Sequence, residues 1–125
     1  MKRLVIDGTD LTPQILGDPD AGRIEITGRS IPENATSFYE PLLNWIEDYK
    51  IQAKKRTELM FHVDYINSIS QKIFYDILDR CSGISKDNEI VVIWKYDEDD
   101  EEILDEGKVF QSKFNLEFNL VEVTE

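Results

Sequence analysis

The sequence predicts an α/β fold: a single-domain sandwich in which an N-terminal antiparallel hairpin leads into βαβ units, with a mixed sheet and about three helices. Three observations carry this prediction. Strand-like and helix-like runs alternate after about residue 23, which is typical of βαβ crossovers. The continuous apolar run Ile90–Trp94 is typical of a strand buried on both faces of a mainly parallel sheet. A segment rich in turn residues, 17–22, separates two short strand candidates.

The first part of the chain predicts three short strands. Leu4–Ile6 is apolar, and 12–16 forms a second candidate whose Pro13 favours an edge position, because proline cannot donate to a strand ladder. Arg23–Thr27 alternates polar and apolar residues, as a half-buried strand does. We expect the last three residues of the second strand, Gln14–Leu16, to pair with Arg23–Thr27 as the hairpin.

The first helix is predicted to run to about Lys50. A start near Ser37 would place Pro41 in the first turn, where its missing N–H does no harm. If Asn34 were the cap instead, Pro41 would lie inside the helix and should kink it. The start near Ser37 is therefore preferred. The apolar residues that recur at helical spacing are Phe38, Leu42, Trp45, Ile46 and Tyr49.

The second half predicts two further helices between strands. A strand over Thr57–Val63 is followed by a helix over Ser68–Cys81, which Ser82 and Gly83 can end. A third helix is expected over about 99–112 and a last strand over 118–123. The predicted inward stripe of the second helix consists of Ile69, Ile73, Phe74, Ile77 and Leu78.

Composition excludes several classes of function. The 125 residues carry 14 basic and 26 acidic side chains, a net charge of −12, which argues against nucleic acid and anionic membranes as partners. A single cysteine rules out an intramolecular disulfide and favours a reducing compartment. The N-terminus lacks the apolar core of a signal peptide, and no run approaches the ~20 apolar residues of a membrane helix. The sequence therefore predicts a cytoplasmic protein.

The acidic block at residues 97–102 is the one candidate for a metal site. Carboxylate oxygens are ligands for hard cations, so a metal-assisted enzyme is one alternative function. The block has no loop glycine at a calcium-loop spacing, however, and it opens a predicted helix, where negative charge is favourable. A solvated helix start is the preferred interpretation, and no metal or cofactor is expected.

No catalytic constellation is predicted elsewhere. His62 is the only histidine, and it lies on the strand face opposite the apolar side chains, so we expect a structural or surface role. Cys81 ends the stripe of the second helix and is expected to be a small buried hydrophobe. We therefore expect no catalytic residues.

The segment Asp64–Lys72, at the junction of a strand and a helix, holds the candidate site. Ser68 could cap the helix in a capping box with Gln71, or Asn67 could be the cap and leave Ser68 free. A free hydroxyl there suits phosphorylation, because the N–H groups and dipole of a helix N-terminus favour a phosphate. Lys72, one turn on, could screen it. The residues alone leave both uses open.

Motifs along the chain resemble those of the SiaC family of bacterial regulatory phosphoproteins. The resemblance runs from about residue 6 to 123. It is carried by Gly8-Thr9, Thr12-Pro13, Ile15, Gly22, Ile26, Gly28, Ser30, Pro32-Glu33-Asn34, Phe38-Tyr39-Glu40-Pro41, Trp45-Ile46, Tyr49, Tyr65-Ile66-Asn67-Ser68, Ser70, Lys72, Trp94, Tyr96-Asp97, Asp99-Asp100, Glu106-Gly107 and Phe110.

This resemblance implies a fold similar to the anti-sigma-factor antagonists (STAS-like), with 1–125 as a single SiaC-like regulatory domain. It implies a non-catalytic component of a partner-switching module. A histidine-kinase-like serine/threonine kinase would phosphorylate one hydroxyl, and a PP2C-type phosphatase would remove the phosphate. The unphosphorylated form would bind and activate an effector, a diguanylate cyclase, and so affect cyclic-di-GMP signalling and biofilm formation.

The family's modified residue follows the Asn of the Tyr-x-Asn motif, which corresponds to Ser68; the family usually has Thr there. Ser70 is the alternative site. The partner-binding face is then expected to comprise Tyr65, Asn67, Ser68, Ser70 and Lys72. An anti-sigma-factor antagonist, with the same fold and switch but an anti-sigma kinase as partner, is the alternative function.

Overall fold

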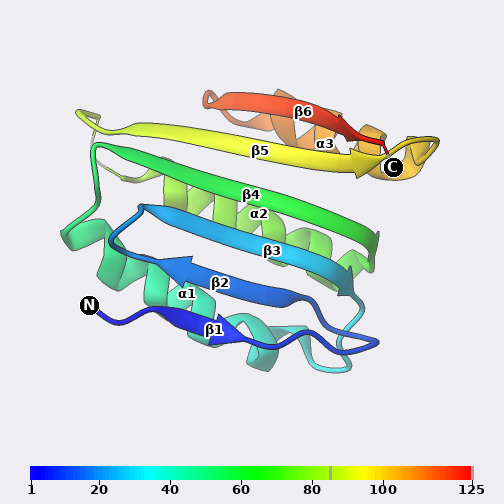
Figure 1. Cartoon of the computed structure of the whole chain (residues 1–125), viewed down its shortest axis with the longest axis horizontal. Helices are drawn as coiled ribbons and strands as arrows, with labels where there is room; N and C mark the ends of the chain where they lie inside the picture. The colour runs from blue at the N-terminus through cyan, green and yellow to red at the C-terminus, as the bar shows by residue number, and fades with distance from the viewer. Residues whose placement is uncertain (85, 125) are drawn as a thin grey trace.

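The computed structural model describes residues 1–84 and 86–124, which form six strands and three helices (Figure 1). Of the predicted span 1–125, residues 85 and 125 lie outside the described residues. The strands are β1 (Leu4–Ile6), β2 (Gln14–Asp18), β3 (Arg23–Ser30), β4 (Arg56–Ile66), β5 (Glu89–Asp97) and β6 (Glu117–Val123), and the helices are α1 (Ala35–Ile51), α2 (Ser68–Ser82) and α3 (Glu101–Lys113).

The strands form one mixed sheet in the order of the chain, β1-β2-β3-β4-β5-β6. β1, β2 and β3 are antiparallel neighbours, whereas β3, β4, β5 and β6 are parallel neighbours joined by helices. Because each crossover moves to the next strand in the same direction, right-handed connections put all three helices on one face. Figure 1 shows them behind the sheet. The predicted α/β sandwich with a hairpin and βαβ units is confirmed.

The predicted hairpin is confirmed, but its edge position is wrong. Gln14 pairs with Thr27 and Leu16 with Glu25, while β2 also pairs with β1 on its other side. Pro13 precedes the strand, so its missing N–H removes no ladder bond. β2 also continues through Gly17. An ideal Cβ at this position would lie only 2.9 Å from the ring of Trp45, so glycine permits the close approach of the strand to this ring.

The predicted start of α1 near Ser37 is also wrong. Asn34 is the cap, and its side chain accepts the backbone N–H of Ser37 at 3.1 Å. Pro41 therefore lies inside a helix that is continuous from Ala35 to Ile51. A strong cap and a buried face outweigh the hydrogen bond that proline cannot make. That face consists of Ala35, Tyr39, Leu42, Trp45, Ile46 and Tyr49.

The core lies between the helices and one face of the sheet. Four of the buried positions in α2 are Ser70, Phe74, Ile77 and Cys81, which recur at helical spacing and define its inward face. Ile69 lies at the margin of that face and is 53% exposed, so its predicted place in the core is wrong. The strand side of the core includes Ile24, Ile26, Leu59, Phe61, Val63, Val92 and Trp94.

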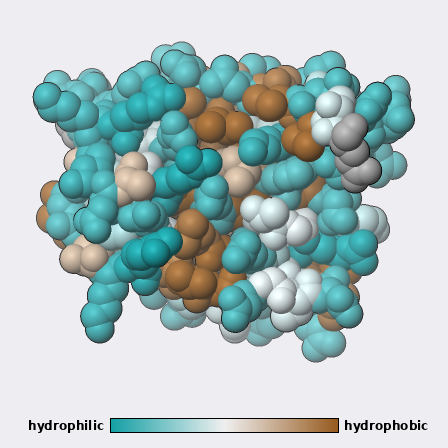
Figure 2. Space-filling model, in the orientation of Figure 1, coloured by the Kyte–Doolittle hydropathy of each residue, from teal (hydrophilic) through white to brown (hydrophobic). Residues whose placement is uncertain are grey.

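The other face of the sheet has no helix over it within the described residues, and Figure 2 shows hydrophobic patches on it between hydrophilic residues. Met60 lies on this face, next to Ile93 of β5, yet is only 6% exposed. Charged side chains border it, including Arg23, which pairs with Glu58 at 3.5 Å. Among the described residues, no helix is both long and apolar enough to cross a membrane.

Candidate functional site

The candidate site lies where β4 ends and α2 begins. The backbone N–H of Asn67 donates to the carbonyl of Ser30, at the end of β3, with a length of 3.0 Å. The N-termini of α2 and α3 lie at the same edge of the sheet, because β4 and β5 are parallel and each helix follows its strand (Figure 1). This edge is the usual location of functional sites in open α/β sheets.

Asn67 is the cap of α2, so the capping box of Ser68 with Gln71 is wrong and the alternative is confirmed. The Asn67 side chain accepts the backbone N–H of Ser70 at 2.9 Å. Gln71 instead donates its side-chain amide to Glu106. Ser68 is the first helical residue and is exposed, and its hydroxyl makes no hydrogen bond to another residue in 1–84 or 86–124. Within the described residues, the Ser68 hydroxyl therefore faces solvent and takes no part in the cap.

Ser70 differs from Ser68 in both its exposure and its hydrogen bonding. Its side chain is fully buried, and its hydroxyl accepts a hydrogen bond from Ser30 Oγ at 2.8 Å. Ser30 Oγ is in turn 2.5 Å from Tyr39 Oη. Burial raises the pKa of the Tyr39 phenol, although its bond with Ser30 opposes this shift. These three hydroxyls link β3, α1 and α2 inside the core, so Ser70 cannot contact a partner in this conformation.

The other predicted site residues reach the surface. Tyr65 is 57% exposed, Ser68 and Lys72 are exposed, and Asn67 is partly buried beneath them. The exposed Ile69 belongs to the same surface. The exposure of Ile69 was not predicted, because the helical spacing of Ile69 and Ile73 favoured a place in the core. The residue that does point inward is Ser70, and a polar side chain gives no apolar signal in the sequence.

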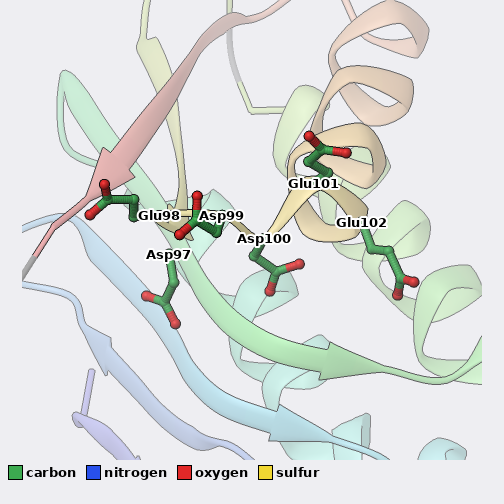
Figure 3. A pocket seen from close by; sticks show the side chains of 6 residues that line it. All are labelled: Asp97, Glu98, Asp99, Asp100, Glu101 and Glu102. Carbon is green, nitrogen blue, oxygen red and sulfur yellow. The ribbon is translucent and has the colours of Figure 1, made fainter.

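The acidic block does not form a metal site. Its carboxylates lie along the turn from β5 to α3 and point in different directions (Figure 3). Asp97 contacts His62 Nε2 at 2.9 Å, and Asp100 caps α3 by accepting the Ile103 N–H at 3.2 Å. Residues 1–84 and 86–124 contain no group of three or more His, Cys, Asp or Glu placed to hold a metal ion. The described residues therefore lack the converging carboxylates that the metal-assisted alternative requires, and α3 begins at Glu101 rather than about residue 99.

A polar cleft of about 200 Å³ lies beside the exposed face, between the end of β4 and the first turns of α2 and α3. Its carboxylates come from Asp64, Asp100, Glu102 and Glu106. Burial raises the pKa of Glu106, and the hydrogen bond from Gln71 opposes that shift. Arg29 is 3.8 Å from Asp64 and offsets part of this charge. The cleft next to the start of α2 therefore carries an excess of negative charge.

His62 and Cys81 lie apart, each in its own surroundings. His62 contacts Asp97 on the open face of the sheet, and no serine or cysteine in the described part of the chain is hydrogen-bonded to it. Cys81 is fully buried, and burial raises the pKa of its thiol to about 12. The thiol is therefore protonated and inaccessible, as its predicted structural role requires.

Comparisons with known proteins agree with this geometry. The family model described as "SiaC family regulatory phosphoprotein" matches residues 6–123. An uncharacterized protein of Pseudomonas aeruginosa strain UCBPP-PA14 is 31% identical over 119 residues, which cover 94% of each chain.

Solved structures from Pseudomonas aeruginosa share the fold along almost the whole chain. Apo-SiaC is 27% identical with a TM-score of 0.83, covering 97% of this chain and 99% of that one. SiaC in the complex of diguanylate cyclase SiaD with its activator SiaC is 29% identical with a TM-score of 0.87, covering 96% and 99%. Since the family model spans nearly every residue, this chain belongs to the SiaC family of regulatory phosphoproteins.

Proposed function

We propose that this chain is a non-catalytic switch protein whose unphosphorylated form binds and activates a diguanylate cyclase. The observation that carries the proposal is the exposed, unbonded hydroxyl of Ser68 at the first position of α2. It occurs in a family of regulatory phosphoproteins, and a similar SiaC forms a complex with the cyclase that it activates. The switch would act in the bacterial cytoplasm and control cyclic-di-GMP signalling and biofilm formation.

The switch itself is reversible phosphorylation of Ser68. A histidine-kinase-like serine/threonine kinase transfers the γ-phosphoryl group of ATP to Ser68 Oγ, and ADP and the hydroxyl proton leave. A PP2C-type phosphatase hydrolyses the resulting ester and restores the hydroxyl. The N–H groups and dipole of the α2 N-terminus favour the phosphate, so the modified state is compatible with the fold. Phosphorylation changes the formal net charge from −12 to about −14.

Phosphate at this position would weaken effector binding for an electrostatic reason. It adds a dianion beside the cleft that already carries Asp64, Glu102 and Glu106. A partner that buries the surface around Tyr65 and Lys72 would have to desolvate this dianion without supplying a matching cation of its own. Release of the effector follows from that cost.

The test compares Ser68→Ala and Ser68→Asp in binding to, and activation of, the cyclase that copurifies with the wild-type chain from its own host. We expect Ser68→Ala to bind and activate like wild type and Ser68→Asp to lose both. Ser37→Asp is the matched control, since Ser37 is an exposed serine in the first turn of α1. Equal binding by both Ser68 variants would remove the switch from Ser68. Recovery of an anti-sigma factor in place of a cyclase would favour the antagonist function.

A further inference from the structure

We propose that the groove between α2 and α3 is the docking site for an amphipathic helix of the effector, with an apolar stripe flanked by acidic side chains. The identity of that effector rests on the proposed function above. The groove has a volume of about 310 Å³ and is lined by Gln71, Lys72 and Tyr75 of α2 and by Glu106, Val109, Phe110 and Lys113 of α3.

The floor and walls of this groove are apolar. Tyr75 is 44% exposed and Val109 is 50% exposed, while Phe110 between them is only 5% exposed. The Tyr75 ring is held by Phe114, with 4.9 Å between ring centroids. Large apolar side chains gathered at one exposed place mark a surface that a partner covers.

The groove is continuous with the surface that carries Ser68. Lys72 lies one helical turn after Ser68 on the same side of α2, and Tyr75 follows one turn later. Gln71 and Glu106 line both this groove and the polar cleft that includes Tyr65, so the two hollows adjoin. A partner seated in the groove would therefore reach the Ser68 hydroxyl without any rearrangement of the domain.

The shape of the groove suits a helix. Its wall on α3 runs from Glu106 to Lys113, about two turns or ~10 Å of helix length. A third helix that lies between two others inserts a ridge of side chains spaced by three or four residues. Apolar residues at i, i+3 or i+4, and i+7 would fill this length.

Charge selects an acidic partner. Lys72 and Lys113 line the groove, and neither forms an ion pair with any other residue in 1–84 or 86–124. The one carboxylate that lines it, Glu106, already accepts the Gln71 amide. A chain with net charge −12 thus presents two uncommitted cations beside an apolar surface. Carboxylates that flank the partner's stripe complement these cations.

This arrangement explains how one phosphate could control docking. A phosphate on Ser68 would lie within reach of the Lys72 ammonium, because residues four apart are neighbours on a helix surface. It would compete with the partner's carboxylate for Lys72 and repel that carboxylate at the same time. The unphosphorylated form is therefore the form that offers both lysines to the partner.

A photo-reactive amino acid at Val109 tests the site in the native host. The control carries the same group at Ile51, which is 87% exposed and lies at the end of α1. We expect cross-links from position 109, and not from position 51, to a peptide with helical apolar spacing and flanking Asp or Glu. Absence of a cross-link at 109, or a cross-link to a segment without that pattern, would overturn the proposal.

Charge reversal provides the second measurement. Lys72→Glu and Lys113→Glu should each weaken binding of the cross-linked protein by about tenfold or more, and reversing the facing acidic residue to Lys should restore it. Lys55→Glu, an exposed change elsewhere, controls for net charge. Equal losses from all three reversals would contradict specific docking. A cross-link from position 109 to a suitable helix of a protein other than a cyclase would support docking in the groove and contradict the cyclase as effector. A cyclase that binds without that cross-link would support the cyclase as effector and contradict docking in the groove.

Discussion

At the start of α2, Asn67 caps the helix in place of Ser68. The Asn67 side chain accepts the Ser70 N–H at 2.9 Å, so the helix does not need the Ser68 hydroxyl as a cap. Ser68 keeps its place beside the free N–H groups of the first turn, where a phosphate is favoured. The cap and the exposed hydroxyl are thus on adjacent residues, so the proposed modification of Ser68 would not remove the cap of α2.

This division of roles predicts different stabilities for two alanine variants. Asn67→Ala should lower the free energy of unfolding by about 1 kcal/mol, because it removes the N-cap bond. Ser68→Ala should change it by less than about 0.5 kcal/mol, as an exposed substitution without a lost contact. Urea unfolding followed by circular dichroism measures both. A larger loss for Ser68→Ala than for Asn67→Ala would show that Ser68 is the cap.

Cys81 gives a second prediction at this scale. Burial raises the pKa of its thiol to about 12, so the group stays protonated below about pH 12 in the folded protein. A disulfide reagent at pH 8 should therefore modify the native protein only through unfolding, while the thiol of the urea-unfolded chain, with an ordinary pKa, should react at once. Reaction of the native protein as fast as the unfolded one would contradict the burial of Cys81.

At the scale of elements, Gly107 explains how α3 packs on β5. A Cβ at this position would lie 2.6 Å from Trp94 Nε1, so only glycine permits the helix to approach the indole this closely. The same indole N–H donates to the carbonyl of Ile103 at 2.9 Å. α3 in turn supplies Val109 and Lys113 to the groove, so this contact positions the proposed docking surface.

Gly107→Ala should therefore destabilise the protein. Alanine gains about 1 kcal/mol of helix propensity over glycine, but overpacking against a buried ring costs about 1–3 kcal/mol. Because the indole is rigid and hydrogen-bonded, we expect the steric cost to be the larger. Thermal unfolding of Gly107→Ala and of the exposed control Lys108→Ala measures the difference. A Gly107→Ala variant more stable than wild type would mean that α3 can move away from Trp94 freely.

The type and order of the elements could be predicted from the sequence, whereas several of their boundaries and positions could not. Periodicity is local, and it was enough to identify the hairpin and each βαβ unit. The internal place of β2 depends on its pairing with β1, which no local pattern near Pro13 reveals. The start of α1 was decided by Asn34 and by a buried face strong enough to hold Pro41 within the helix.

At the scale of the molecule, parallel topology brings the two helix starts together. Ser68 follows the end of β4, and the acidic turn follows the end of β5, so the candidate site and the negative cleft share one edge of the sheet. Sequence reasoning identified the Ser68 segment but not the contact of Gln71 with Glu106, nor the groove that joins Lys72 to Lys113. The two residues of each pair are more than thirty positions apart in the sequence, and the order of the strands in the sheet brings them together.

The net charge of −12 is also a property of the whole molecule, and in the proposed switch it determines that phosphate weakens binding. A phosphate added to an already negative edge raises repulsion toward any acidic partner. In contrast, Lys72 and Lys113 of the groove are positive side chains on a surface that is mainly negative. Under the proposed switch, this field would favour an effector that pairs with Lys72 in the unphosphorylated state and is released when Ser68 is modified.

The most direct test is intact mass measurement after incubation of the folded chain with its cognate kinase and ATP, followed by mapping of the modified residue. The central claim predicts a single phosphate on Ser68, none in the Ser68→Ala variant, and none on the buried Ser70. The purified phosphatase should then return the wild-type mass to its starting value. A phosphate on Ser70, or undiminished phosphorylation of Ser68→Ala, would contradict the account.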